Sequence, residues 1–186
     1  YKKDVYLYTG DAYYKAGQVE RAEQIYKAYL NENTNTEIIS SLMSSLLDQQ
    51  KYDEMNQYLS SVSDDNNLSY LKGIATMGLK KYDEAETHFQ NVLSNGDQSL
   101  STKVYLNRVR NFFLAEKYNE AIQAGEQYLS KINPDKEKAI YSEMLDKIGL
   151  SYFRLGKYDQ ARSYYSKIAS MKGYEVYGKF QIADSY

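Results

Sequence analysis

A short phrase recurs five times along this chain, and its regular spacing limits what the chain can fold into. One copy reads Lys81-Tyr82-Asp83-Glu84-Ala85, and the others repeat it with small changes. We take the residue that follows the lysine, or its equivalent in the first copy, as an anchor. The anchors are Val19, Tyr52, Tyr82, Tyr118 and Tyr158, at intervals of 33, 30, 36 and 40 residues. Repeats of this length build arrays in which each unit packs against its neighbours.

Other positions repeat in phase with the anchors. Three residues after each anchor the chain has Ala22, Met55, Ala85, Ala121 and Ala161. Seven residues after it come Tyr26, Leu59, Phe89, Gly125 and Tyr165. Six residues before it come Tyr13, Leu46, Thr76, Phe112 and Tyr152, and nine before it Gly10, Met43, Gly73, Val109 and Gly149. Small residues let two helices approach closely, and aromatic rings fill the gaps that remain.

The residues between anchors favour helices throughout. The chain contains a single proline, Pro134, and long stretches place apolar residues three and four apart. Together with the five copies in phase, this pattern resembles the tetratricopeptide repeat over essentially the whole chain; that family's period is about 34 residues. The resemblance implies an all-α fold, a right-handed superhelical solenoid of antiparallel helix hairpins.

We expect one array over residues 1–186. Its approximate repeats are 3–34, 36–66, 67–98, 99–136, 138–173 and a partial sixth at 174–186. First helices are expected near 2–15, 36–48, 67–79, 99–115 and 138–155, and second helices near 18–31, 51–62, 81–94, 117–131 and 157–170. The segment 174–186 is expected to be the first helix of the sixth repeat. Because the chain starts at Tyr1 and Gln181–Tyr186 stops within a helical pattern, we expect a piece of a longer protein.

Two copies depart from the pattern. The second has Met43 and Met55 where small residues are usual, so we expect wider hairpin packing there. The fourth has Val109 and Gly125 at key positions, and its hairpin is expected to deviate as well. The extra residues before the last two anchors should lie near 95–97 and 133–135, either in longer loops or in lengthened first helices.

Composition excludes several classes of protein. Charged residues make up 26% of the chain and apolar residues 42%, which argues against disorder, and no apolar run is long enough to insert into a membrane. The formal net charge of -2, with dispersed basic residues, gives no reason to expect nucleic acid. Cysteine is absent, which excludes disulfides and thiolate sites. That absence leans slightly toward an extracytoplasmic location, although a reducing cytosol tolerates it too.

In the tetratricopeptide family the first helices line a concave surface that usually binds an extended peptide or a partner helix. The resemblance places residues five, eight and twelve before each anchor on that surface. The candidate partner-binding residues are Leu7, Asp11, Tyr14, Leu47, Tyr70, Ile74, Met77, Leu106, Arg110, Phe113, Asp146, Leu150 and Phe153. This mixed aromatic and apolar lining suits an amphipathic helix or an extended apolar segment. The alternative is that some of these aromatic residues only pack against the neighbouring repeat.

Some family members bind acidic C-termini through a clamp of lysine and asparagine on the first helices. Here the corresponding positions carry Leu7, Asp11, Ser40, Ser44, Tyr70 and Ile74. These side chains bring no cluster of cations together, so we expect no carboxylate clamp.

Catalysis is not expected. The single histidine, His88, lies beside a packing residue on a second helix, and a catalytic or metal-binding histidine needs an orienting partner or further ligands. Phosphate-binding glycine loops and nucleophile elbows are absent, and Asp and Glu residues are expected at solvated helical positions. We therefore expect no enzyme activity, no cofactor and no metal.

The preferred interpretation is a protein–protein interaction scaffold within a larger assembly. An alternative is a regulatory or targeting module of a longer enzyme or signalling protein that contacts its own neighbouring domain. Self-association through the open C-terminal repeat, where Phe180 and Ile182 lack a following helix, is a third possibility.

Overall fold

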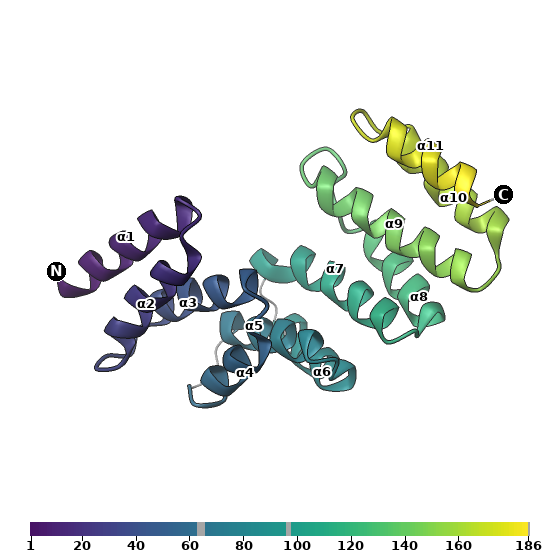
Figure 1. The fold of residues 1–186 in the computed structure, drawn as a ribbon. Helices are drawn as coiled ribbons and strands as arrows, with labels where there is room; N and C mark the ends of the chain where they lie inside the picture. The colour runs from purple at the N-terminus through teal and green to yellow at the C-terminus, as the bar shows by residue number, and fades with distance from the viewer. Residues whose placement is uncertain (63–65, 96–97, 186) are drawn as a thin grey trace. The chain divides into compact units, whose positions relative to one another are not determined.

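The structure, a computed structural model, describes residues 1–62, 66–95 and 98–185. Over these residues it is helical, with eleven helices (Figure 1). Their bounds are α1 Lys2–Lys15, α2 Val19–Leu30, α3 Thr36–Asp48, α4 Tyr52–Ser60, α5 Asn66–Gly78, α6 Tyr82–Ser94, α7 Gln98–Leu114, α8 Tyr118–Leu129, α9 Lys138–Arg154, α10 Tyr158–Ala169 and α11 Glu175–Asp184. Each predicted helix is present, with its ends within two residues of the expected positions in most cases.

The helices form two compact units, Tyr1–Lys81 and Tyr82–Tyr186. The first contains α1 to α5 and the second contains α6 to α11. Within each unit, a helix packs against the next helix along the chain, as in the pairs α1–α2 and α9–α10 (Figure 1). The first helices of successive hairpins also touch, α1 with α3 and α7 with α9. The packing is therefore that of stacked helical hairpins.

Each hairpin turns in the same way. The residue two before the anchor has a left-handed backbone, and these residues are Gly17, Gln50, Lys80, Glu116 and Gly156. The following N–H donates to a carbonyl five residues earlier, as from Gln18 to Tyr13 and from Lys157 to Tyr152, both at 2.9 Å. This is the Schellman arrangement, which ends a helix and satisfies its last carbonyl groups. The repeated sequence phrase thus marks a repeated turn.

Tyrosine rings seated on glycines hold the hairpins together. In the first hairpin the ring of Tyr26 fills the space where a Cβ at Gly10 would lie. In the fifth, a Cβ on Gly149 would come within 2.6 Å of Cε1 of Tyr165. Both tyrosines are almost fully buried. These contacts confirm the physical reason given for small residues nine before the anchor.

The second hairpin is wider, as its methionines predict. Met43 and Met55 are both fully buried, so each fills space between the helices. The backbones of α3 and α4 approach within 8 Å at far fewer positions than those of α1 and α2. Bulky side chains at the hairpin contact account for the separation.

The fourth hairpin does not open in this way, and α7 and α8 approach much as other pairs do. The extra residues of the fourth and fifth repeats lie in longer first helices. The helices α7 and α9 each have 17 residues, whereas α3 has 13. The predicted insertion point near residue 95 extends into 96–97, which lie outside the described residues. Residues 134–136 form a turn before α9.

Candidate functional site

The thirteen predicted partner-binding residues lie on the first helices α1, α3, α5, α7 and α9. Nine are half-buried: Asp11, Tyr14, Leu47, Tyr70, Met77, Arg110, Phe113, Leu150 and Phe153. The other four, Leu7, Ile74, Leu106 and Asp146, are buried, with 5–7% of their surface exposed. The buried positions can contribute little area to a partner, so the half-buried ones define the candidate surface of each unit.

Two tyrosine hydroxyls bind carboxylates on the candidate surface of the first unit. Tyr14 on α1 donates to Oδ2 of Asp48 at the end of α3, at 2.6 Å. Tyr26 on α2 donates to Oδ1 of Asp11, at 2.7 Å. The hydrogen bond to Asp48, together with burial, raises the pKa of Tyr14 to about 12. Tyr14 therefore stays a neutral donor over the physiological range and ties α1 to α3.

An aromatic pair recurs in the second unit. Phe113 on α7 lies edge-on to Tyr118, with ring centroids 5.6 Å apart. Phe153 on α9 lies edge-on to Tyr158, with centroids 5.3 Å apart. In both pairs the phenylalanine lies five residues before the anchor and the tyrosine is the anchor itself. The Lys147 ammonium also lies 5.5 Å from the ring centroid of Phe113. Two successive hairpins thus present the same aromatic pair, in which the phenylalanine is half-buried.

Polar contacts join the successive first helices of this unit. Arg110 on α7 binds the Glu143 carboxylate on α9 through Nε and Nη2, both at 2.6 Å. Tyr177 on α11 donates to Oδ1 of Asp146 on α9, at 2.5 Å. Lys147 lies 3.2 Å from the other Asp146 oxygen. Burial, followed by the hydrogen bond to Asp146, raises the pKa of Tyr177 to about 12. These contacts fix the spacing of α7, α9 and α11.

A cavity of 410 Å³ lies beside this contact, between α9, α10 and α11. It is lined by Ala139, Ser142, Glu143, Asp146, Ile168, Tyr174 and Tyr177. Its carboxylates are already bound by Arg110, Lys147 and Tyr177, so the wall it offers is mostly aromatic and aliphatic.

Two acidic residues depart from the expectation that carboxylates lie at solvated positions. Glu23 and Asp146 are each only 7% exposed. A helical acidic residue can point toward a neighbouring repeat when that repeat supplies donors, and both residues have such partners.

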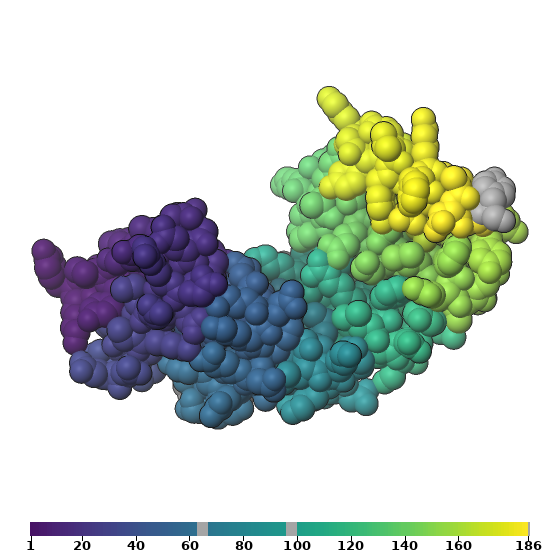
Figure 2. Space-filling model, viewed as in Figure 1, coloured from purple at the N-terminus to yellow at the C-terminus, as the bar shows by residue number. Residues whose placement is uncertain are grey.

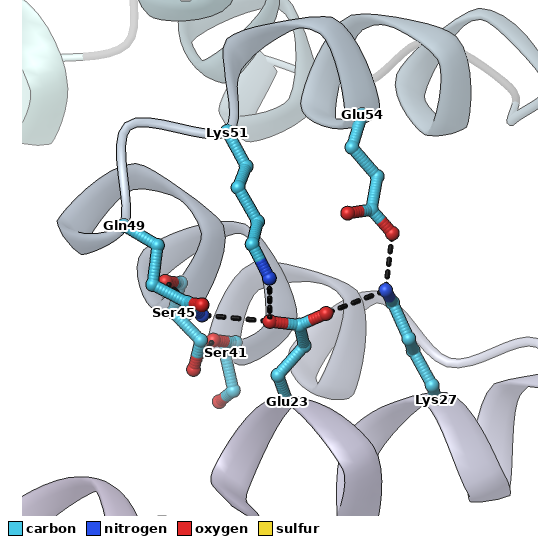
Figure 3. A network of polar contacts seen from close by, with 7 residues as sticks. All are labelled: Glu23, Lys27, Ser41, Ser45, Gln49, Lys51 and Glu54. Carbon is cyan, nitrogen blue, oxygen red and sulfur yellow. Dashed lines mark hydrogen bonds and ion pairs between the residues drawn. The ribbon is translucent and has the colours of Figure 1, made fainter. Parts of the chain in front are cut away.

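Glu23 is the centre of a charged network that joins three helices (Figure 3). Its carboxylate accepts hydrogen bonds from Lys27 at 2.6 Å, Gln49 at 2.7 Å and Lys51 at 2.8 Å. Lys27 also pairs with Glu54 on α4. Burial disfavours the charged form, but these three hydrogen bonds outweigh it and lower the pKa of Glu23 to about 2. The network fastens α2 to α3 and α4, where the hairpin is widest.

The described residues offer little for catalysis. Among them, no group of three or more His, Cys, Asp or Glu side chains could hold a metal ion. His88 is half-buried on α6. Of the helices described, none is long and apolar enough to cross a membrane. The absence of enzyme activity stays a prediction.

Sequence reasoning missed the partners Asp48, Glu143 and Tyr177. Each lies about one repeat from the residue it binds, at separations of 34, 33 and 31 residues. The ion pair Lys3–Glu37, at 2.6 Å, has the same spacing. A search for complementary polar residues one repeat apart would have found these contacts.

Comparison with known proteins agrees with the hairpin geometry. The family model for the tetratricopeptide repeat matches residues 4–36 and 143–170, which hold the first and fifth repeats. No curated protein sequence matches the chain.

Several solved structures share the fold. The C-terminal part of a TPR repeat-containing protein from Cytophaga hutchinsonii is 16% identical, with a TM-score of 0.72, over 96% of this chain and 69% of that one. A tetratricopeptide repeat protein from Parabacteroides merdae is 17% identical, with a TM-score of 0.67, over 97% of this chain and 70% of that one. A structure of MamA is 19% identical, with a TM-score of 0.66, over 94% of this chain and 96% of that one. The family model thus matches two of the repeats, and the fold of the chain is similar to that of these solved tetratricopeptide repeat structures.

Proposed function

We propose that this chain is a protein-interaction scaffold whose first helices bind an apolar peptide or an amphipathic helix of a partner. The observation that carries the proposal is the repeated aromatic pair, Phe113 with Tyr118 and Phe153 with Tyr158. Phe113 and Phe153 lie at the same repeat position on α7 and α9 and are half-buried. Rings that keep part of their surface accessible can bury it against a partner, and aromatic residues are enriched at binding hot spots.

The first unit offers a comparable row. Tyr14, Leu47 and Met77 occupy the same repeat position on α1, α3 and α5, and all three are half-buried. A partner with apolar residues at regular intervals suits such a row.

Pre-organisation supports the same proposal. The contacts Arg110–Glu143 and Tyr177–Asp146 hold the first helices of the second unit at fixed spacing before any partner arrives. A surface that is already ordered loses less conformational entropy on binding. The polar groups are bound to one another, so the partner is expected to contribute apolar rather than strongly charged side chains.

Affinity capture from the source lysate, read by mass spectrometry, tests the proposal with three forms of the chain. The double variant Phe113→Glu, Phe153→Glu places charge at both phenylalanine positions and is expected to lose the partner. The double variant Gln123→Glu, Gln127→Glu is the matched control, because it adds two charges at exposed positions of α8, which is a second helix. Circular dichroism verifies that each variant remains helical.

A protein captured by the wild type and by the Gln123→Glu, Gln127→Glu control, but not by the phenylalanine double variant, supports a binding surface on the first helices. Capture of the same proteins by all three forms refutes it. If the double variant loses helicity, the milder pair Phe113→Ser, Phe153→Ser replaces it.

A further inference from the structure

A pocket lies between the first helices α9 and α11 of the second unit. Its volume of 410 Å³ is within the range of about 300–1,000 Å³ that is typical of binding pockets. The backbones of α7 and α9 approach within 8 Å of each other, whereas those of α9 and α11 do not over the described residues. Both α9 and α11 reach the surface in Figure 2, where α9 is green and α11 is yellow. The pocket thus lies where two neighbouring first helices stay apart.

The two carboxylates of the pocket already have cations beside them. Glu143 is bound by Arg110 at 2.6 Å, and Asp146 lies 3.2 Å from the Lys147 ammonium. Asp146 also accepts the hydroxyl hydrogen bond of Tyr177. A charged group that entered the pocket would lose its water without gaining a free opposite charge. The occupant that suits the pocket is therefore uncharged.

The rest of the wall is aromatic and aliphatic. Tyr177 is 42% exposed and Tyr174 is half-buried, while Ile168 of α10 is fully buried and Ala139 of α9 is exposed. The hydrogen bond to Asp146 holds the Tyr177 side chain in place before any ligand arrives. Aromatic side chains gain from edge-on contact with such rings beyond the area that they bury. The second unit itself contains two edge-on pairs of phenylalanine and tyrosine.

Further repeats after α11 would leave this pocket open if they stack as the described hairpins do. Within each unit, the backbone of a second helix approaches the first helix of its own hairpin and that of the next, as α8 approaches α7 and α9. Among the described helices, α10 approaches neither α7 nor α8, and α11 does not approach α7. A second helix after α11, or the first helix of another repeat, would therefore pack on α11 and away from α9.

A hollow at the same repeat position exists in the first unit, between α3 and α5. Its volume is 450 Å³, and it is lined by Thr36, Glu37, Ser40, Ser41, Ser44 and Asn67. Thr36, Glu37 and Ser40 lie 16, 15 and 12 residues before their anchor, and Ser142, Glu143 and Asp146 have the same places in the fifth repeat. A hollow here is thus a feature of the repeat. The lining in the first unit is polar, so only the pocket of the second unit suits an aromatic ring.

The pocket lies on the same side of α9 as Phe153. Asp146 and Phe153 are seven residues apart, which is about two turns and about 10 Å along the helix. Both residues belong to the predicted partner-binding positions of this helix. A segment that covers Phe153 can therefore reach the pocket along α9.

We propose that the pocket between α9 and α11 takes one aromatic side chain, phenylalanine or tryptophan, of the partner segment that the first helices bind. The inference rests on the proposed function and adds the chemistry of one partner residue to it. The aromatic ring packs on Tyr174, Tyr177 and Ile168, while the carboxylates stay bound to Arg110 and Lys147. Partner segments with a lysine or an arginine at this place are rejected, because the pocket has no free charge to pair with them.

Titration of the full chain with capped amino acids, followed by NMR, tests the pocket without the partner. N-acetyl-phenylalaninamide is expected to bind with a Kd of about 1 mM, as a small ligand in a preformed pocket can. N-acetyl-leucinamide is expected to bind more weakly, and N-acetyl-lysinamide at least about tenfold more weakly. Equal affinity for the three amides overturns the proposal, and so does the absence of binding by the phenylalanine amide.

Variants locate the binding. Ala139→Leu fills the pocket from its exposed rim and is expected to weaken binding of the phenylalanine amide at least about tenfold. Gln123→Leu adds the same side chain at an exposed position of α8 and should leave the affinity unchanged. Circular dichroism verifies folding. If Ala139→Leu loses helicity, Tyr174→Ser takes its place, since it removes one ring of the wall. Binding that survives in the folded pocket variant overturns the proposal.

Capture from the source lysate separates this inference from the proposed function. Capture that is lost with Phe113→Glu, Phe153→Glu but unaffected by Ala139→Leu supports the first-helix surface and overturns the pocket. Capture that Ala139→Leu weakens and Gln123→Leu does not supports both. If the phenylalanine amide binds but the phenylalanine double variant captures the same proteins as the wild type, the surface around Phe113 and Phe153 is refuted and the aromatic preference of the pocket stands.

Discussion

Gly125 on α8 lies directly against Ile148 on α9, where a Cβ at Gly125 would come within 2.6 Å of the isoleucine Cγ1. In the first and fifth repeats this position, seven after the anchor, holds a buried tyrosine that packs on a glycine of its own hairpin. In the fourth repeat the small residue is on the second helix, and the next hairpin supplies the large one. In the fourth repeat the small and large residues thus exchange places, and they meet between two hairpins rather than within one.

The exchange predicts that a larger residue at Gly125 is harmful even though the repeat pattern favours one there. Gly125→Leu is expected to lower the free energy of unfolding by about 2 kcal/mol through overpacking. Ile148→Ala alone should cost about 3 kcal/mol, because it leaves a cavity in a fully buried site. Urea denaturation of the double variant should give a loss well below the sum, since the leucine fills the cavity. If the two losses of stability simply add, the side chains at positions 125 and 148 do not occupy the same space.

The left-handed turn residues predict a gain in stability. Gln50 and Glu116 have φ of 56° and 59°, a conformation that costs an L-residue with a Cβ roughly 1–2 kcal/mol. Gln50→Gly and Glu116→Gly should each raise the free energy of unfolding by about 0.5 kcal/mol, after the greater freedom of glycine in the unfolded chain is counted. Chemical denaturation measures this.

Ala115→Gly is the control, because Ala115 precedes Glu116 without a positive φ and should lose stability when replaced. Gly156→Ala, at a φ of 72°, should also lose about 1 kcal/mol. Glycine variants at residues 50 and 116 that are less stable than wild type would contradict the turn geometry.

The helix pattern could be predicted from the sequence because it depends on local signals. The anchor phrase and the small residues nine before it lie within one hairpin. The polar contacts could not be predicted in the same way. Glu143 and Tyr177 reach across to the preceding first helix, and which side chain of a repeat makes that contact depends on helix rotation. Glu23 was expected to lie in solvent. Two of the residues that donate to its carboxylate, Gln49 and Lys51, come 26 and 28 positions later in the chain, so the local sequence does not reveal them.

The candidate surface shows the same limit. The repeat position placed Phe113 and Phe153 on the first helices, where the structure has them half-buried. It also placed Leu106 and Asp146 there, and these are buried. The position in the repeat predicts on which helix, and roughly on which side of it, a residue lies. The exposed fraction of its side chain depends on the neighbouring repeat. Asp146 on α9 is covered because Tyr177 on α11 binds it.

Ala161 tests the packing of the fifth hairpin. It is fully buried and lies in a cluster with Leu145, Tyr165 and Ile168. Ala161→Glu combines overpacking with a buried charge, so it should lower the free energy of unfolding by at least about 3 kcal/mol. Gln160→Glu places the same residue at the neighbouring exposed position and should change little. Thermal melts of both variants measure the difference, and a normal melt for Ala161→Glu would show that this hairpin contact is misplaced.

The Glu23 network predicts an acid-dependent loss of stability. Lys27, Gln49 and Lys51 lower the pKa of Glu23 from 4.5 to about 2 in the folded chain, although burial acts in the opposite direction. The folded state thus holds the proton less tightly than the unfolded state does. The resulting stability is fully present above the unfolded pKa of 4.5 and is lost as the pH falls through about 2. We expect the loss to be about 3 kcal/mol, as a shift of this size implies.

Urea denaturation at a series of pH values between neutral and acidic separates this contribution from that of other carboxylates. Glu23→Gln cannot titrate at this position, so its stability should fall less steeply with acid than that of the wild type. Glu20→Gln removes an exposed carboxylate from the same helix and should follow the wild-type curve. Parallel curves for wild type and Glu23→Gln would show that the pKa of Glu23 is the same in the folded and the unfolded chain. The ion pairs that join α2 to α4 would then contribute no pH-dependent stability to the wide second hairpin.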